Sequence, residues 1–355
     1  MKGFLILESG ESFAGEWFGR AAQVGEVVFN TSHSGYEEIV TDPSYFGQIM
    51  VMTAPMQGNY GTHDEDWESS RVWVRGFVCV ELETQGPGRK WFERMESLGV
   101  PFLSSVDTRR LVLRLRSGGT PVGVLLAADS EGEAREKAKA HFAGFHVLRG
   151  QDWTQKVSRD SIQDLRGSRA DGPRLAVVDF GAKENILREV CHLAKEVRVF
   201  PSGTSAAQIL EWNPAGIVLS NGPGDPTDVK AGIETTKQLI GQRPLFGICM
   251  GHQVLALALG ARTFKLRFGH RGGNHPVRDH LLNRVYITSQ NHGYAVDTQS
   301  LAEGVQQTHV NLYDGTCEGI ELAARKCMSV QFHPESCPGP HDARPLFQLF
   351  KERWL

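Results

Sequence analysis

Residues 245–253 have the sequence Leu-Phe-Gly-Ile-Cys-Met-Gly-His-Gln, an apolar run that ends at a cysteine with glycines two positions before and after it. A helical pattern follows at 254–259 and stops at Gly260. This arrangement is typical of a nucleophile elbow, in which a strand turns sharply into a helix and presents one side chain. Glycines are needed on both sides because so tight a turn leaves no room for a β-carbon. A buried structural cysteine is the alternative that this motif alone leaves open.

The position of Cys249 at the start of the expected helix also affects its chemistry. Unpaired N–H groups give a helix N-terminus a partial positive charge, which favours thiolate over thiol. A free cysteine is only a few per cent thiolate at neutral pH, so this stabilisation would make Cys249 a much better nucleophile.

The C-terminal half of the chain alternates between short apolar runs and helical patterns. Such alternation predicts a mostly parallel sheet flanked by helices on both faces. The runs lie at 175–180, 197–200, 216–219 and 245–248, and the helical patterns at 184–194, 205–212 and 229–240. Sites in sheets of this kind lie at the carboxyl ends of strands, where Cys249 stands.

The N-terminal half has short apolar runs separated by turns, together with three helical patterns, and it predicts a mixed, strand-rich α/β domain. The runs lie at 3–7, 24–30, 48–53 and 72–80, and the helices at 89–98, 108–117 and 131–141. A polar, charge-rich segment separates the halves. We therefore predict an N-terminal domain over 1–150, a linker over 151–172 and a C-terminal domain over 173–355, which suits the length of 355 residues.

The composition excludes several functional classes. A hydrophobic content of 40% with 22% charged residues is ordinary for a globular protein, and a net charge of -3 gives no sign of nucleic-acid or membrane binding. No apolar run is long enough to span a membrane. Six scattered cysteines form no C-x-x-C pair and no H-E-x-x-H motif occurs, so we predict no metal site and a reducing, cytoplasmic location.

A candidate partner for the thiol lies near the C-terminus. Residues 328–333 alternate in polarity like a strand that ends at His333, and in extended backbone Glu335 would share the face of His333. An imidazole that exchanges the cysteine proton, with a carboxylate that holds its tautomer, completes a catalytic triad. A surface His-Pro-Glu turn is the alternative when the motif is considered by itself.

Three polar segments are further candidates for a site, and two of them, 220–226 and 289–296, follow apolar strands. The glycine-rich stretch 220–226 could present N–H groups that, with the N–H of Met250, form an oxyanion hole. Segment 268–277 holds glycine, histidine and arginine too densely for a buried element, and 289–296 is similarly polar. We predict both as loops beside a cleft that bind polar groups of a small substrate, with plain solvated loops as the alternative.

These motifs resemble the class I, or triad, glutamine amidotransferases. The three signatures are Asn-Gly-Pro-Gly-Asp-Pro at 221–226, Gly-Ile-Cys-Met-Gly-His-Gln at 247–253 and His-Pro-Glu at 333–335. Further stretches resemble one branch of that family, the small chains of carbamoyl-phosphate synthase. They lie at 268–277, 290–294 and 338–343 and, in the N-terminal half, at 28–32, 35–38, 41–45, 58–61 and 106–109.

The resemblance implies a concrete chemistry. Cys249 would attack the side-chain amide of L-glutamine, release ammonia and form a γ-glutamyl thioester that water hydrolyses. His333 would act as base and acid, and Glu335 would orient it. The positions that would bind glutamine, carried over by motif, are Ser44, Gly222, Gly224, Met250, Gln253, Asn291, Gly293 and Tyr294.

The resemblance also implies a partner. A separate large chain would use the ammonia, and the ATP and Mg expected there mean that this chain needs no cofactor. We expect no binding of nucleic acid or membrane. Two alternatives remain open: another amidotransferase or free-standing γ-glutamyl hydrolase, and a non-catalytic regulatory subunit.

Overall fold

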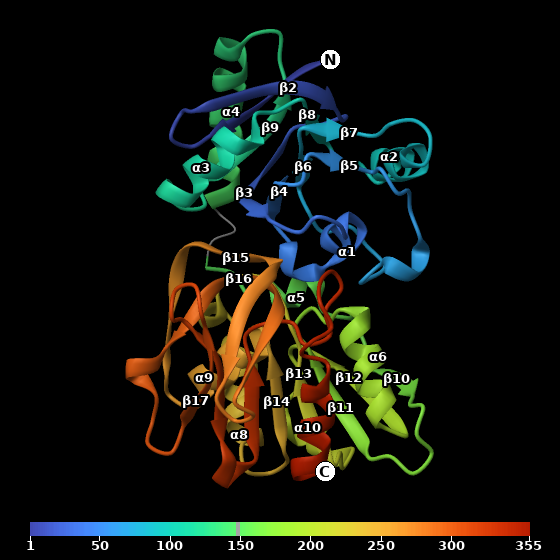
Figure 1. Cartoon of the computed structure of the whole chain (residues 1–355), viewed down its shortest axis with the longest axis vertical. Helices are drawn as coiled ribbons and strands as arrows, with labels where there is room; N and C mark the ends of the chain where they lie inside the picture. Colours follow the sequence, from blue (N-terminus) through green and yellow to red (C-terminus); the bar gives the residue numbers. More distant parts are fainter. Residues whose placement is uncertain (147–149) are drawn as a thin grey trace. The chain divides into compact units, whose positions relative to one another are not determined.

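The structure is a computed structural model that describes residues 1–146 and 150–355. It contains two compact units, Met1–Gln151 and Asp152–Leu355, each with its own core (Figure 1). The alternating patterns predicted a mixed N-terminal domain and a helix-covered sheet in the C-terminal domain, and both parts of this fold class are confirmed. Among the described residues, no helix is long and apolar enough to cross a membrane.

The first unit is built on a closed barrel with the strand order β1-β2-β8-β6-β4-β3-β9. The strands are β1 (Lys2–Leu7), β2 (Ser12–Phe18), β3 (Gln23–Asn30), β4 (Gln48–Met52), β6 (Gly76–Val78), β8 (Phe102–Ser104) and β9 (Val122–Ala127), beside the short pair β5 (Met56–Gln57) and β7 (Glu81–Leu82). The helices are α1 (Tyr36–Thr41), α2 (Gly88–Ser97), α3 (Thr108–Gly118) and α4 (Glu131–His146). Helix α2 contributes Trp91, which is fully buried against Phe77 and Phe102.

The second unit has one ten-stranded sheet in the order β10-β12-β11-β13-β14-β19-β18-β17-β15-β16. Strands β12, β11, β13, β14 and β19 run parallel, and the remaining pairings are antiparallel. The strands are β10 (Gln163–Arg166), β11 (Arg174–Asp179), β12 (Glu196–Pro201), β13 (Gly216–Leu219), β14 (Leu245–Ile248), β15 (Arg262–Asp279), β16 (Arg284–Asp297), β17 (Gln306–Asn311), β18 (Cys317–Leu322) and β19 (Cys327–Val330).

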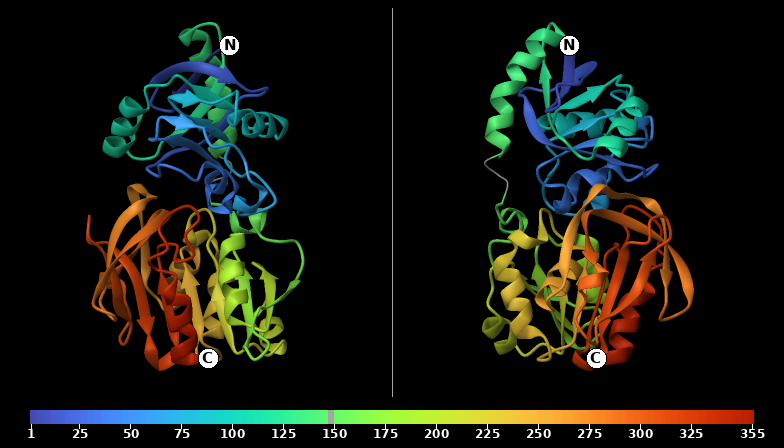
Figure 2. Two further views of the ribbon diagram at one scale, coloured as in Figure 1. Left: turned by 45° about the vertical axis from the view of Figure 1, so that its right-hand side comes forward. Right: turned by 90° about the vertical axis from the view of Figure 1, so that its left-hand side faces the viewer.

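Helices cover both faces of the parallel strands, as two views of the sheet show (Figure 2). Leu175 and Val177 of β11 face a core with α6 (Glu184–Leu193) and α10 (Pro345–Trp354). Ala176 and Val178 face the opposite core with α7 (Ala206–Glu211), α8 (Lys230–Leu239) and α9 (Met250–Ala258). Because both faces are buried, the strands are continuously apolar, which made them recognisable in the sequence.

Part of the segment predicted as a linker is regular structure in the second unit. Residues 154–157 form α5 (Thr154–Val157), and β10 pairs antiparallel with β12 at the edge of the sheet. The Asp164 carboxylate on β10 accepts from the Arg198 guanidinium on β12 at 2.6 Å. The charge density that suggested a linker therefore belongs to an exposed edge strand, where charged side chains discourage further strand pairing.

Candidate active site

Cys249 stands between β14 and α9 in a strained backbone conformation. Its φ is 53° and its ψ is -102°, a combination that L-residues rarely adopt. Two backbone hydrogen bonds hold the turn: Cys249 N–H donates to the Val330 carbonyl, and Gly251 N–H to the Ser220 carbonyl, each at 2.9 Å. Strain of this kind persists only where the surroundings fix it, and it is common at functional sites.

The two glycines beside Cys249 are required by close backbone contacts. A β-carbon at Gly247 would lie 2.6 Å from the Gly251 carbonyl oxygen, and one at Gly251 would lie 2.1 Å from the Leu219 carbonyl oxygen. Both distances are far below van der Waals contact, so any side chain there would displace the turn. The crowding predicted for the elbow is thus present in the structure.

His333 follows β19, the strand that pairs with β14, and its N–H donates to the Ser289 carbonyl at 2.9 Å. Its Nδ1 lies 2.6 Å from Glu335 Oε1. Nε2 makes no hydrogen bond to nitrogen or oxygen atoms within the described part of the chain, while the Cys249 sulfur acts on the ring electrostatically. All three side chains are buried, and the Cys249 thiol faces the Asn291 carbonyl at 3.5 Å.

The charges of these groups stabilise one another. Burial would lower the pKa of His333, but the Glu335 carboxylate and the Cys249 sulfur raise it above its usual range. Burial would likewise raise the pKa of Glu335, but Lys183 and His333 hold it well below its usual range. An imidazolium between a carboxylate and a sulfur is the form in which a cysteine nucleophile is ionised.

Lys183 is a buried member of this site that the sequence reasoning missed. Its Nζ lies 3.1 Å from Glu335 Oε1 and donates to the Ser336 carbonyl at 2.5 Å, and its side chain is 2% exposed. Asn185 adds a hydrogen bond to the Glu335 carbonyl. A signal did exist, because residues 181–183 directly follow the carboxyl end of β11, where sites in such sheets lie.

Seven of the eight predicted glutamine-binding residues lie in the second unit. Gly222 and Gly224 follow β13; a β-carbon at Gly222 would lie 2.3 Å from the Phe180 carbonyl oxygen, and Gly224 has a φ of 94°. Met250 and Gln253 are on α9, and Asn291, Gly293 and Tyr294 are on β16. The Gln253 side chain donates to the Tyr294 carbonyl at 2.9 Å, which joins helix and strand.

Ser44, the eighth residue, lies in the first unit. It is the middle residue of the 3-10 helix Pro43–Tyr45, which is capped by the Asp42 carboxylate accepting from Ser44 N–H at 2.9 Å. The side chain is buried. Its assignment to glutamine binding stays a prediction from the family motif.

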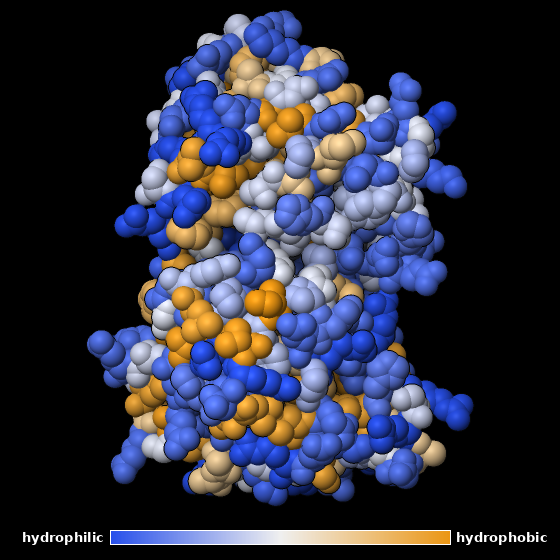
Figure 3. Space-filling view, in the orientation of Figure 1, coloured by the Kyte–Doolittle hydropathy of each residue, from blue (hydrophilic) through white to orange (hydrophobic). Residues whose placement is uncertain are grey.

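The prediction that segments 268–277 and 289–296 are loops was wrong. They belong to β15 and β16, and the side chains of His270, Arg271, Gln290 and His292 are at most 5% exposed. This hairpin reverses the usual pattern: it buries polar groups that bond to each other, while Val285 and Ile287 are 41% exposed. Figure 3 shows apolar side chains among hydrophilic ones on one face of the molecule. The polarity of these segments therefore led to a wrong prediction, because polar side chains can be buried when they are paired with one another.

A buried cluster of ionisable side chains lies on the antiparallel strands beside Asn291. His270, His292 and Glu318 bring ligand atoms within 4.8 Å of one another, a spacing that can hold a metal ion. Hydrogen bonds already occupy these groups: His270 Nε2 lies 2.8 Å from Asp314 Oδ2, and the Gln290 amide bonds to both His292 and Glu318. The geometry therefore favours a hydrogen-bonded network.

His270 gives a prediction for pH. Burial would lower its pKa, but the Asp314 and Glu318 carboxylates raise it to about 9. The unfolded chain releases the His270 proton near pH 6.5, whereas the folded chain keeps it until about pH 9. The stability that protonated His270 contributes is therefore fully present below pH 6.5 and is lost as the pH rises through 9. The loss in the free energy of unfolding should reach about 3 kcal/mol. Urea unfolding at several pH values should show that His270→Gln costs much stability at pH 6 and little at pH 10; a constant cost would contradict this.

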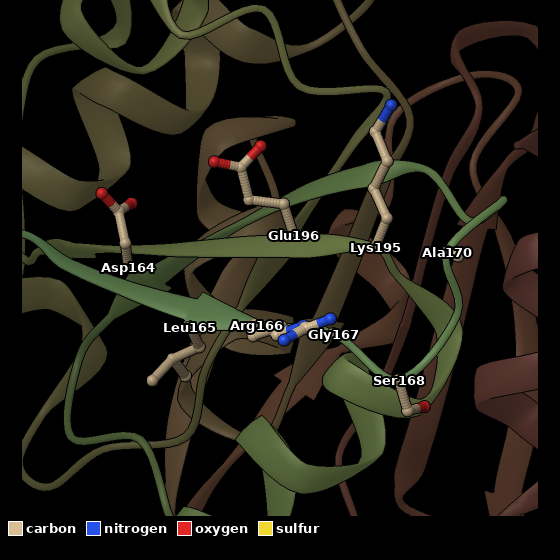
Figure 4. Close-up of a pocket in the computed structure, with 8 residues that line it drawn as sticks. All are labelled: Asp164, Leu165, Arg166, Gly167, Ser168, Ala170, Lys195 and Glu196. Atoms are coloured by element: carbon tan, nitrogen blue, oxygen red, sulfur yellow. The ribbon is translucent and has the colours of Figure 1, made fainter.

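The pocket in Figure 4 is a separate feature of the second unit. It lies around β10 and the beginning of β12, and none of the triad residues lines it. The two carboxylates that line it are already paired, with Asp164 bonded to Arg198 and Glu196 to Arg174 at 3.1 Å. None of the residues predicted to bind glutamine lines it either.

Comparison with known proteins gives a family match for each half of the chain. The family model for class-I glutamine amidotransferases matches residues 176–353, and the model for the CPSase domain of carbamoyl-phosphate synthase small chains matches residues 5–125. The matched ranges fall one in each unit of the structure.

Curated relatives match along almost the whole chain. A carbamoyl phosphate synthase small chain from Symbiobacterium thermophilum is 47% identical over 97% of this chain and 96% of its own. One from Thermus thermophilus is 46% identical over 98% of this chain and 92% of its own. Among solved structures, a glutamine amidotransferase from Thermotoga maritima covers 50% of this chain and 82% of its own at 20% identity, with a TM-score of 0.38. That similarity is too low to add anything about function.

Proposed function

This chain belongs to the carbamoyl-phosphate synthase small chain family, and from that premise we propose the residues and steps by which it works. It is a glutamine-hydrolysing subunit of this synthase, with a class-I amidotransferase domain. We propose that Cys249 is the nucleophile, His333 the proton carrier and Glu335 the group that orients His333. The observation that supports this most is the 2.6 Å contact between Glu335 and His333, whose other ring nitrogen is left for the Cys249 sulfur.

The reaction follows from the charges of these groups. The Cys249 thiolate attacks the carboxamide carbon of L-glutamine, and the carbonyl oxygen takes up the negative charge. The His333 imidazolium donates its Nε2 proton to the leaving nitrogen, so that ammonia departs and a γ-glutamyl thioester remains. His333, now neutral, takes a proton from water, which attacks the thioester and releases glutamate with the thiolate. Glu335 stays ionised throughout, stabilised by Lys183.

The surrounding backbone supports the roles proposed for the other residues. The N–H of Met250, at the start of α9, and the glycine-rich turn at Gly222 and Gly224 are the candidates for the oxyanion hole. We propose that Gln253, Asn291, Gly293 and Tyr294 contact the glutamine. Ser44 is proposed as a further contact on the family motif alone.

The family also supports a partner. We propose that ammonia passes to a large synthase chain, which would bind ATP and Mg, and that this chain itself needs no cofactor. Six free cysteines fit a reducing compartment, and we propose a cytoplasmic location.

Trapping of the intermediate tests this function. The chain, with and without the large chain, is mixed with radiolabelled glutamine and quenched in acid, and the labelled peptide is mapped. We expect label on Cys249 and faster ammonia release with the large chain present. Label on another residue, or none, would contradict the proposed roles. Full activity without any partner would favour a free-standing γ-glutamyl hydrolase.

A further inference from the structure

Residues 291–294 of β16 contain three of the proposed glutamine contacts, and two side chains fix their backbone. The carbonyl oxygen of Tyr294 lies 2.9 Å from Gln253 Nε2 and 2.7 Å from His292 Nδ1. The Asn291 carbonyl faces the Cys249 sulfur. The position of the His292 ring therefore bears directly on the shape of the glutamine site.

The other side of the His292 ring meets Gln290. The ring Nε2 lies 2.9 Å from Gln290 Oε1, and Gln290 Nε2 donates to Glu318 Oε2 at 2.9 Å and to Thr288 Oγ1 at 3.1 Å. Thr288 already donates its own proton to the His275 carbonyl. Both neighbours of Gln290 Nε2 are thus acceptors, which fixes the amide orientation and turns Oε1 toward the ring.

Glu318 is itself held in place. Asn311 Nδ2 donates to its Oε1 at 2.9 Å, and His270 Nδ1 lies 3.5 Å from the same atom. Glu318 is fully buried, and Gln290 and His292 are at most 5% exposed. The chain Glu318–Gln290–His292 is therefore shielded from water, which strengthens each hydrogen bond and penalises any unpaired member.

The His292 ring has an oxygen atom on either side. Burial, and then the nearby His270 charge, lower the pKa of His292 well below its usual value, so the ring is neutral and has one N–H. Its two nitrogens face one oxygen atom each, Nε2 that of the Gln290 amide and Nδ1 that of the Tyr294 carbonyl, so the ring is held between these two groups. A displaced Gln290 amide would therefore move the ring and with it the contact to the Tyr294 carbonyl.

We propose that Gln290, held by Glu318, is a positioning residue that fixes the place of the His292 ring and thereby the backbone of residues 291–294 for glutamine binding. This rests on the function proposed above. It acts through His292 and contacts no reacting atom. Its loss should weaken glutamine binding and leave the chemical step largely intact.

Exchanging the amide at residue 290 with the carboxylate at residue 318 tests this proposal directly. Gln290→Glu places two carboxylates against each other, and we expect the KM for glutamine to rise about tenfold or more while kcat changes about twofold. Gln290→Leu should raise KM about fivefold. The double variant Gln290→Glu with Glu318→Gln restores one amide and one carboxylate, and its KM should return to within about twofold of wild type.

A matched control separates positioning from loss of stability. Tyr286 lies on the same strand as Gln290 but outside this chain of contacts, and its hydroxyl donates to Asp279. Tyr286→Phe removes that buried hydrogen bond and should keep a wild-type KM. All variants are assayed in the complex with the large chain, where ammonia-dependent synthesis should stay unchanged. Nitrogen NMR of the His292 ring should show resonances that change in Gln290→Leu and return in the double variant.

Each other outcome overturns the inference. Wild-type KM in both Gln290 variants, or failure of the double variant to recover, would show that Gln290 does not position the site. One tight Zn²⁺ site in the wild-type chain, lost in Glu318→Gln, would show that His270, His292 and Glu318 hold a metal instead. A wild-type complex without glutamine hydrolysis would refute the proposed function by itself, whatever the Gln290 variants do.

Discussion

Glutamine-dependent synthesis should fall by at least about 10³-fold when Cys249 is replaced by serine, because a hydroxyl is a far weaker nucleophile than a thiolate beside an imidazolium. Synthesis from added ammonia should survive, since in the proposed division of labour that reaction needs only the partner chain. The change is nearly isosteric, and the strained backbone at residue 249 is retained. The measurement is carbamoyl-phosphate formation by the complex with either nitrogen source.

Replacement of another buried thiol provides the control for this experiment. Burial raises the pKa of Cys79 to about 12, so its replacement by serine should leave glutamine use intact. Loss of both nitrogen sources in the Cys249 variant would indicate a failure of assembly, and retention of glutamine use would exclude Cys249 as the nucleophile.

Replacing Lys183 with methionine should have the second-largest effect, on stability and activity together. The change leaves the Glu335 carboxylate buried without its ammonium partner, a loss typically worth about 3–5 kcal/mol. The pKa of Glu335, which Lys183 helps to lower, would rise, and a protonated Glu335 could no longer stabilise the His333 imidazolium. We expect a lower urea midpoint and at least about tenfold slower glutamine hydrolysis.

A double variant separates the effect on stability from the effect on activity. Lys183→Met with Glu335→Gln removes both charges, so it should recover much of the lost stability. Glutamine hydrolysis should stay low, because an amide cannot hold His333 as an imidazolium. Recovery of activity in the double variant would show that the ion pair serves stability alone.

Much of this site could be predicted from the sequence because its parts are local. The elbow at 245–253 and the His-Pro-Glu segment carry their geometry in a few adjacent residues, so spacing was enough to pair Cys249 with His333 as candidates. The parallel strands were recognisable since both of their faces are apolar. Roles for individual residues remain predictions until tested.

The features that could not be predicted are contacts between distant residues. Lys183 meets Glu335 across 152 positions in sequence, and nothing in the local pattern near either residue specifies that pairing. The hairpin β15–β16 was misjudged because its buried side chains are polar, and only their mutual hydrogen bonds make burial favourable. Hydrophobic periodicity identifies a core only where the core is apolar.

The order of the strands has a consequence for the synthesis of this protein. Strand β19, the last in the sequence, lies in the middle of the sheet between β14 and β18. On the ribosome, the thiol of Cys249 must therefore emerge well before the residues that complete the central strand and supply its base. The growing chain has two half-sheets with open edges, which invite pairing with other chains. With the roles proposed above, a nascent chain of this design would be inert toward glutamine until strand β19 is inserted, and that insertion is also the step that closes those edges.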